Sequence, residues 1–106
     1  MVTIYNTTLS ATSQRHFSDG LGGGIIINCK SIGYHCTANT GVIVGNNSKG
    51  GLPIIGNNVD LTIGCKVIGD VCVGDNVIVA PNSVVIKDVP NHAVVSGVPA
   101  KNIEDK

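Results

Sequence analysis

The 106-residue chain has few aromatic and few charged residues. It contains no tryptophan, one phenylalanine and two tyrosines, so aliphatic side chains must fill its core. Charged residues make up 13% of the chain, and seven Lys and Arg balance seven Asp and Glu. A neutral chain without a basic patch does not suit nucleic acid or an anionic membrane as a partner. The length predicts a single domain.

Long apolar runs are also missing. No run reaches the ~20 residues of a membrane-spanning helix, and residues 1–20 lack the hydrophobic stretch of a signal peptide. We therefore expect a cytoplasmic protein with no membrane partner. No two histidines have the spacing of a metal-binding pair, so we expect no metal site. The cysteines, predicted to be free thiols because their spacing is not motif-like, are Cys29, Cys36, Cys65 and Cys72.

The chain does have an internal repeat with a period of six residues. One run of aliphatic residues keeps this step, and the residue four positions after each is small or β-branched. An earlier run keeps the same step out of phase, because Val44 and Ile55 are eleven residues apart rather than twelve. The repeated positions are Ile26, Ile32, Ala38 and Val44 in the first run; Ile55, Leu61, Val67, Val73, Val79 and Val85 in the second; and Val59, Cys65, Val71, Val77, Ser83 and Val89 four positions on.

So short a period predicts a parallel β-helix. Three hexapeptides close one triangular coil of about 18 residues, and successive coils stack about 4.8 Å apart through parallel-strand hydrogen bonds. The repeated aliphatic and small residues then point into a narrow prism. We expect an all-β fold of about three to four coils over residues 21–90, interrupted by a loop at residues 45–53, where the phase changes. Residues 1–20 are expected to form an irregular N-terminal arm, and residues 91–106 a C-terminal cap.

The second half of the chain resembles the hexapeptide-repeat acyltransferases. The stretch from Ile54 to Ile103 has their cadence and ends in the characteristic "SGVPAKNI". Together with "GGGIIIN" and "VIVGNNSKGGLPIIG", it is most similar to serine acetyltransferases and the O-acetyltransferases of surface polysaccharides. The resemblance implies a left-handed parallel β-helix, a homotrimer, and acetyl-CoA as co-substrate in the groove between two subunits. It further implies transfer of an acetyl group to a serine or sugar hydroxyl, with a histidine as general base.

The usual histidines are replaced at the matching positions. The resemblance aligns them with Leu21, with Leu52 and, in the polysaccharide branch, with Asn39. Two other histidines are candidate bases, His16 in the N-terminal arm and His35 at an outward corner, although both also fit solvated surface positions. The third, His92, is expected to be structural.

Candidate cofactor-binding residues come from the loop and from the coils. The loop contributes Gly45, Lys49 and Gly50, whose glycines suit close approach to a ligand; it is not a phosphate-binding P-loop, because no Gly-Lys-Ser/Thr opens a helix. A plain corner insertion is the alternative. The resemblance adds two pairs, Thr62 with Ile63 and Ala80 with Pro81. Two lysines are placed to meet CoA phosphates or, equally, to be solvated: Lys87 and Lys101.

Two functions therefore remain open. The first is a CoA-dependent O-acetyltransferase that acts on a small hydroxyl acceptor. The second, favoured by Leu21 and Leu52, is a non-catalytic relative that trimerises or binds CoA without turnover. An ice- or sugar-binding β-helix would need a flat outward array of threonines, which this chain does not have.

Overall fold

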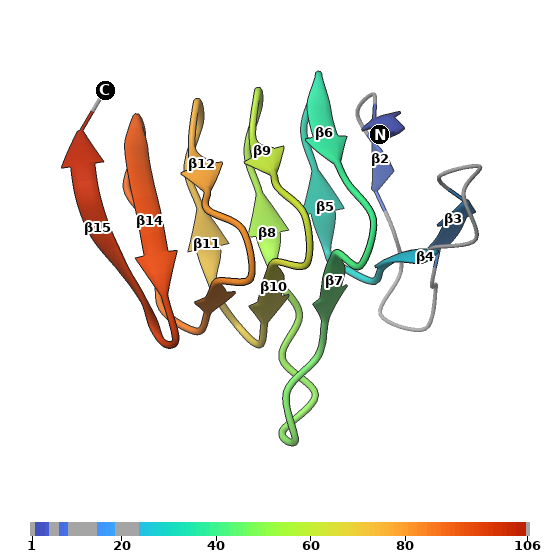
Figure 1. Cartoon of the computed structure of the whole chain (residues 1–106). Coiled ribbons are helices and arrows are strands. Elements are labelled where there is room, and N and C mark those ends of the chain that lie inside the picture. Colours follow the sequence, from blue (N-terminus) through green and yellow to red (C-terminus); the bar gives the residue numbers. More distant parts are fainter. Residues whose placement is uncertain (1, 5–6, 9–14, 19–23, 106) are drawn as a thin grey trace.

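The computed structural model describes residues 2–4, 7–8, 15–18 and 24–105, and within these it contains strands and no helix. The strands form three sheets that enclose a prism (Figure 1). The six-stranded sheet contains β1 (Val2–Ile4), β6 (Cys36–Ala38), β9 (Asp60–Leu61), β12 (Ile78–Val79), β14 (Ala93–Gly97) and β15 (Ala100–Asp105). The five-stranded sheet contains β3 (Arg15–Ser18), β4 (Gly24–Ile27), β7 (Ile43–Gly45), β10 (Lys66–Ile68) and β13 (Val84–Val85). The four-stranded sheet contains β2 (Thr7–Thr8), β5 (Ser31–Ile32), β8 (Ile54–Ile55) and β11 (Cys72–Val73).

Consecutive strands visit the three sheets in turn, so the chain winds as a coil. Between β4 and β14, equivalent strands of successive coils pair in parallel, as in β4–β7–β10–β13. Such pairing satisfies the backbone of one coil with the backbone of the next. The prediction of an all-β parallel β-helix is confirmed.

The core of the prism is a column of aliphatic and small side chains. Every residue of the second predicted run and every residue four positions on is buried, including Ser83 at 1% exposure. In the first run, the prediction for Ile26 is wrong. Ile25 and Ile27 are buried in the core, whereas Ile26 is half-buried and faces outward. Cys29 is likewise fully buried, whereas Cys72 is exposed. All four cysteines are free thiols, as predicted.

Both ends of the stack are covered by antiparallel strands. Residues 1–20, expected as an irregular arm, include β1, β2 and β3, which pair antiparallel with β6, β5 and β4 of the first coil. The segment from residue 91, expected as a cap, begins with β14, which still continues the parallel ladder from β12. The antiparallel β15 then follows at the edge of the six-stranded sheet. No described helix has the length and apolar character to cross a membrane.

Candidate functional site

The outward face of the five-stranded sheet carries two rows of side chains that cross the coils. In the first row, Ile26 of β4 lies beside Ile43 of β7, which lies beside Lys66 of β10. In the second row, Gly45 lies beside Ile68 of β10. On the other side of Gly45, Asn28 continues the line of β4, and its backbone N–H donates to the carbonyl of Val44 at 2.8 Å. Gly45 therefore leaves a gap between Asn28 and Ile68.

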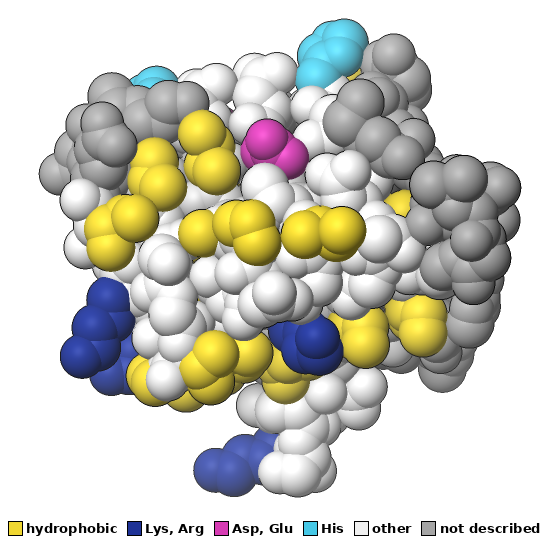
Figure 2. Space-filling view, in the orientation of Figure 1, with side chains coloured by type: hydrophobic (Ala, Val, Ile, Leu, Met, Phe, Trp, Pro, Cys, Tyr) yellow, Lys and Arg dark blue, Asp and Glu magenta, His cyan; other side chains and the backbone are white. Residues whose placement is uncertain are grey.

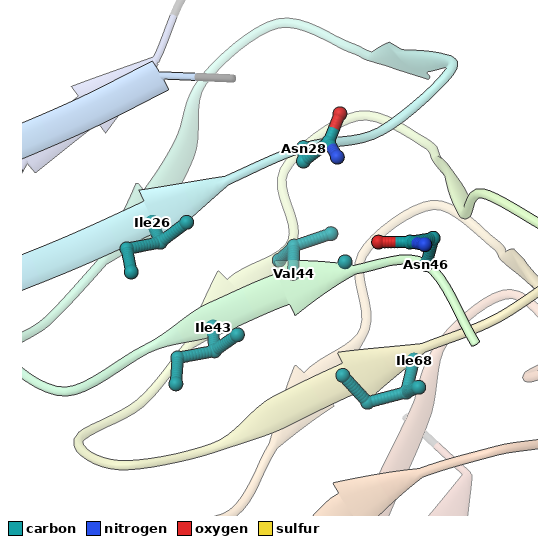
Figure 3. Close-up of a pocket in the computed structure, with 7 residues that line it drawn as sticks. Ile26, Asn28, Ile43, Val44, Asn46 and Ile68 are labelled. Carbon is teal, nitrogen blue, oxygen red and sulfur yellow. The ribbon is translucent and has the colours of Figure 1, made fainter. Parts of the chain in front are cut away.

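This gap is a pocket of about 230 Å³. A Cβ atom placed on Gly45 would meet no other atom within 4 Å, so the glycine forms an open floor rather than a tight contact. Figure 3 shows the carboxamides of Asn28 and Asn46 at the side of the pocket where β4 and β7 end, with Ile26 and Ile43 on the other side. The residues that line it are Ile26, Asn28, Ile43, Val44, Gly45, Asn46 and Ile68.

Asn28 has an unsatisfied polar atom. Its carboxamide oxygen Oδ1 is buried and accepts no hydrogen bond from the described residues. A buried acceptor without a partner costs about 1–3 kcal/mol. Such a group is often kept at a functional position. The hexapeptide repeat alone did not single out Asn28, Asn46 or Ile68, because they become neighbours only through the register of separate coils.

The loop after β7 is an ordered turn built around one side chain. The Oδ1 atom of Asn47 accepts hydrogen bonds from the backbone N–H groups of Lys49 at 2.9 Å and Gly51 at 3.0 Å. The backbone N–H of Gly50 also donates to the carbonyl of Asn47 at 3.0 Å. The loop projects from the corner between the five- and four-stranded sheets, next to the pocket (Figure 1). Lys49 and Gly50 are exposed at its tip.

Leu52 is buried at the point where this loop rejoins the prism. Its side chain is 3% exposed, and Pro53 beside it is buried. The carbonyl of Pro53 accepts a 2.8 Å hydrogen bond from the backbone N–H of Lys30 in the preceding coil. The position at which the resemblance expects a histidine is therefore a packed apolar anchor. Leu21, another such position, lies outside the described residues.

The structure separates the two candidate bases. The backbone register places His16 of β3 directly opposite Ile26, which lines the pocket. Opposed positions of an antiparallel ladder share one face of the sheet, so position 16 belongs to the face that carries the pocket. His35 lies between β5 and β6, at the corner opposite the five-stranded sheet. Its backbone has φ = 59°, and the equivalent corner residues with positive φ are Asn58, Asn76 and His92. His35 is therefore a corner residue remote from the pocket.

The predicted cofactor pairs lie together at another corner, between the six- and five-stranded sheets. The backbone N–H groups of Thr62 and Ala80 donate to Val79 and Val95 at 3.3 and 2.9 Å, and the Thr62 hydroxyl also donates to the carbonyl of Val79. These donors are thus engaged between coils. The side chain of Ile63 is 50% exposed, and Pro81 is exposed on the next coil.

Asn39 lies on the coil before these pairs, and its N–H donates to Leu61 at 3.1 Å. The two predicted phosphate-binding lysines lie on or just after the last strands of two different sheets. Lys87 is exposed just after β13, and Lys101 is exposed on β15, at the end of the stack away from the loop (Figure 1). Among the described residues, no group of three or more His, Cys, Asp or Glu side chains is arranged to hold a metal ion.

No protein-family model matches the chain. A serine acetyltransferase from Synechococcus elongatus is 36% identical over 86 residues, which cover 77% of this chain and 35% of that protein. A solved serine acetyltransferase from Brucella abortus strain S19 superposes with a TM-score of 0.67 at 32% identity, over 70% of this chain and 31% of the other. The same enzyme in complex with coenzyme A gives a TM-score of 0.64 at 30% identity, over 70% and 31%. The predicted left-handed β-helix is confirmed by this likeness. The chain spans about a third of the length of these proteins.

Proposed function

Since the chain is homologous to serine acetyltransferases over most of its length, we propose that it is an acetyl-CoA-dependent acetyltransferase that acts on a hydroxyl group of a small molecule. The observation that carries this proposal is the likeness to a serine acetyltransferase solved with coenzyme A.

We propose that CoA lies along the corners beside the five-stranded sheet. The loop residues Gly45, Lys49 and Gly50 stand at one corner, and Thr62 and Ala80, with their neighbours, at the other. The backbone N–H groups of Thr62 and Ala80 are already bonded between coils, and their carbonyl oxygens already accept backbone hydrogen bonds. These two residues would therefore contact CoA mainly through side-chain surface. The exposed ammonium of Lys49 supplies a point charge for a phosphate.

A homotrimer is part of the proposal. Figure 2 shows hydrophobic side chains in rows that cross the coils on one face. Exposed isoleucines lie on more than one side of the prism: Ile54 of the four-stranded sheet is 39% exposed, and Ile63 and Ile86, at either side of the five-stranded sheet, are each 50% exposed. Burying such side chains between subunits would enlarge the small apolar core of a short prism. The four free thiols suit a reducing compartment, which supports the cytoplasm as its location.

The proposed chemistry is direct transfer. The acceptor oxygen attacks the carbonyl carbon of the thioester while the base takes the hydroxyl proton. The carbon–sulfur bond then breaks, which leaves the acetyl ester of the acceptor, and the base returns the proton to the sulfur so that CoA departs as a thiol. His16 is the proposed base, because its backbone position is opposite Ile26 on the face of the pocket. A general base of this kind contributes about 10²–10⁴-fold to the rate.

The test is release of CoA from acetyl-CoA with serine and sugar acceptors, followed by chromatography because Cys72 would itself react with thiol reagents. His16→Ala is expected to lower kcat by about 10²–10⁴-fold. His35→Asn is the matched control and keeps the wild-type rate, since His35 occupies a remote corner. Full turnover in His16→Ala would contradict the assignment of the base. A monomer in sedimentation experiments would contradict the trimer.

A second function is supported by the buried Leu52. The Leu52 side chain is buried where the loop rejoins the prism, and a leucine cannot accept a proton. A protein that binds CoA without turnover would show saturable CoA binding in calorimetry and no release of CoA with any acceptor. Restored turnover in Leu52→His would identify a chain that lost its base.

A further inference from the structure

We infer that the pocket above Gly45 is the acceptor site and that it takes a neutral, polyhydroxylated compound, of which a sugar is the type. This inference rests on the proposed acetyltransferase function and names the substrate class of the same site. The inference rests on the chemistry of the pocket lining, which combines the carboxamides of Asn28 and Asn46 with the side chains of three isoleucines.

The hollow is a property of the sheet itself. Gly45 is held between two coils, since its carbonyl accepts a 3.0 Å hydrogen bond from Gly69 and its backbone is in register with Ile68. Asn28 is fixed in turn by the 2.8 Å bond from its N–H to Val44. A site on regular strands keeps its geometry better than one on a loop. The pocket is therefore preformed.

The lining has two chemical parts. Ile26, Ile43 and Ile68 supply apolar surface, against which the C–H face of a sugar ring packs. Asn28 and Asn46 supply carboxamides, each of which both donates and accepts hydrogen bonds. The buried Oδ1 of Asn28 has no donor among the described residues. Because Oδ1 has almost no accessible surface, a ligand hydroxyl bonds to it only after the Asn28 carboxamide has turned toward the pocket, and this bond would recover the free energy that the orphaned acceptor costs.

The same lining disfavours a charged acceptor. Free serine carries an ammonium and a carboxylate. Moving either group from water to a surface of hydrocarbon and carboxamides costs much more than moving a hydroxyl. A neutral sugar loses only the water molecules bound to its hydroxyl groups, and hydrogen bonds to the two asparagines replace them. The pocket therefore favours a sugar over the amino acid.

Size and position agree with this assignment. A volume of about 230 Å³ lies below the ~300–1,000 Å³ of clefts that hold drug-sized ligands, so it suits one small ring. Gly45 is also the residue from which the proposed CoA-binding loop departs, and position 16 lies opposite Ile26. Acceptor, base and thioester would thus meet at one end of one sheet.

The experiment is an NMR titration of the full chain with methyl glucoside, methyl galactoside and, for comparison, L-serine. Saturable shifts of the side-chain NH₂ signals of Asn28 and Asn46 with a glycoside, and none with serine, would support the inference. Gly45→Val fills the pocket where no atom stands within 4 Å, and it is expected to weaken glycoside binding at least tenfold. Gly24→Ala, at the other end of the same sheet region and also without a neighbour within 4 Å, is the control and leaves binding unchanged.

Three outcomes would overturn the inference. These are no shift with any glycoside, shifts with serine alone, and wild-type glycoside binding in a folded Gly45→Val. Asn28→Leu gives a second reading if Gly45→Val is poorly folded, and it too must weaken binding. CoA release measured on the same samples reports separately on the proposed function. Glycoside binding at the asparagines without CoA release would support the ligand class and contradict the activity.

Discussion

The Oδ1 atom of Asn57 accepts a 2.8 Å hydrogen bond from the backbone N–H of Tyr34 in the preceding coil. The same contact recurs up the corner, from the N–H of Asn57 to Asp75 and from the N–H of Asp75 to Asn91, each at 2.8 Å. The glycine before each donor makes room for the oxygen: a Cβ on Gly56 would lie 2.3 Å from Oδ1 of Asp75. Side chains thus tie together the backbones of successive coils at this corner.

Asp75→Ala is expected to lower the free energy of unfolding by about 0.5–1.5 kcal/mol, because the exposed hydrogen bond from the N–H of Asn57 is lost and water takes the place of the carboxylate. Urea denaturation monitored by circular dichroism measures the change. Asp75→Asn keeps an acceptor oxygen in the same place and should stay close to wild type. Equal losses in the two variants would show that charge rather than the hydrogen bond matters.

His35→Asn is expected to keep or slightly raise stability. The backbone of His35 has φ = 59°, and asparagine occupies the equivalent corners at Asn58 and Asn76 with φ of 57° and 58°. Asparagine tolerates this conformation better than most residues. His35→Val should cost about 1–2 kcal/mol, because a branched Cβ is strained there. Thermal unfolding of the two variants side by side tests the ranking, and a valine variant as stable as wild type would be inconsistent with it.

The buried thiols should make the protein lose stability at alkaline pH. Burial raises the pKa of Cys65 from 9.0 to about 12 and that of Cys29 to about 11. Above pH 9 the unfolded chain therefore releases protons that the folded chain retains. The stabilisation is complete below pH 9 and is lost as the pH rises toward 11, by about 1.4 kcal/mol per pH unit for each such thiol.

Urea midpoints measured between pH 8 and pH 11 show this slope. Cys65→Ala should make the slope shallower by one thiol, because the raised pKa of this buried thiol is then absent. The same burial predicts that one thiol per native chain, Cys72, reacts rapidly with iodoacetamide at neutral pH. Rapid labelling of Cys65 in the folded protein would refute the burial argument.

Asn47→Ala is expected to weaken acetyl-CoA binding several-fold with little loss of global stability. The side chain of Asn47 holds the loop by accepting from Lys49 and Gly51, and its removal frees the segment that carries Lys49. Isothermal calorimetry gives the Kd, with Ser48→Ala as the control on the same loop. Unchanged affinity in Asn47→Ala would mean that the loop geometry plays no part in binding CoA.

Much of the prism follows from the six-residue step, because a residue that faces inward in one coil does so in the next when the coils have equal length. This holds from Val67 to Val85, which are paired in register 18 residues apart. It fails at Ile26, because Ile27 pairs with Val44 only 17 residues later. One shorter corner moves the inward position by one residue.

The site was harder to predict, for a physical reason. The pocket depends on which residues stand side by side in different coils, and the loop at residues 45–53 changes that register. The sequence predicts a binding role for Gly45 from its place in the loop. That Gly45 forms the bottom of a pocket depends on its neighbours Asn28 and Ile68, which belong to other coils. The pairing of His16 with Ile26 required β3 to run antiparallel to β4, which no repeat in the sequence signals.

The antiparallel strands at the two ends of the stack close it without fixing its length. In a ladder of parallel coils, each coil touches only its neighbours and presents the same edge to the next. Here β1, β2 and β3 close that edge beside the first coil, and β15 closes the six-stranded sheet beyond β14. The number of coils between these ends is therefore adjustable in principle: inserting one further 18-residue coil would lengthen the molecule by about 4.8 Å while each end strand kept its partner.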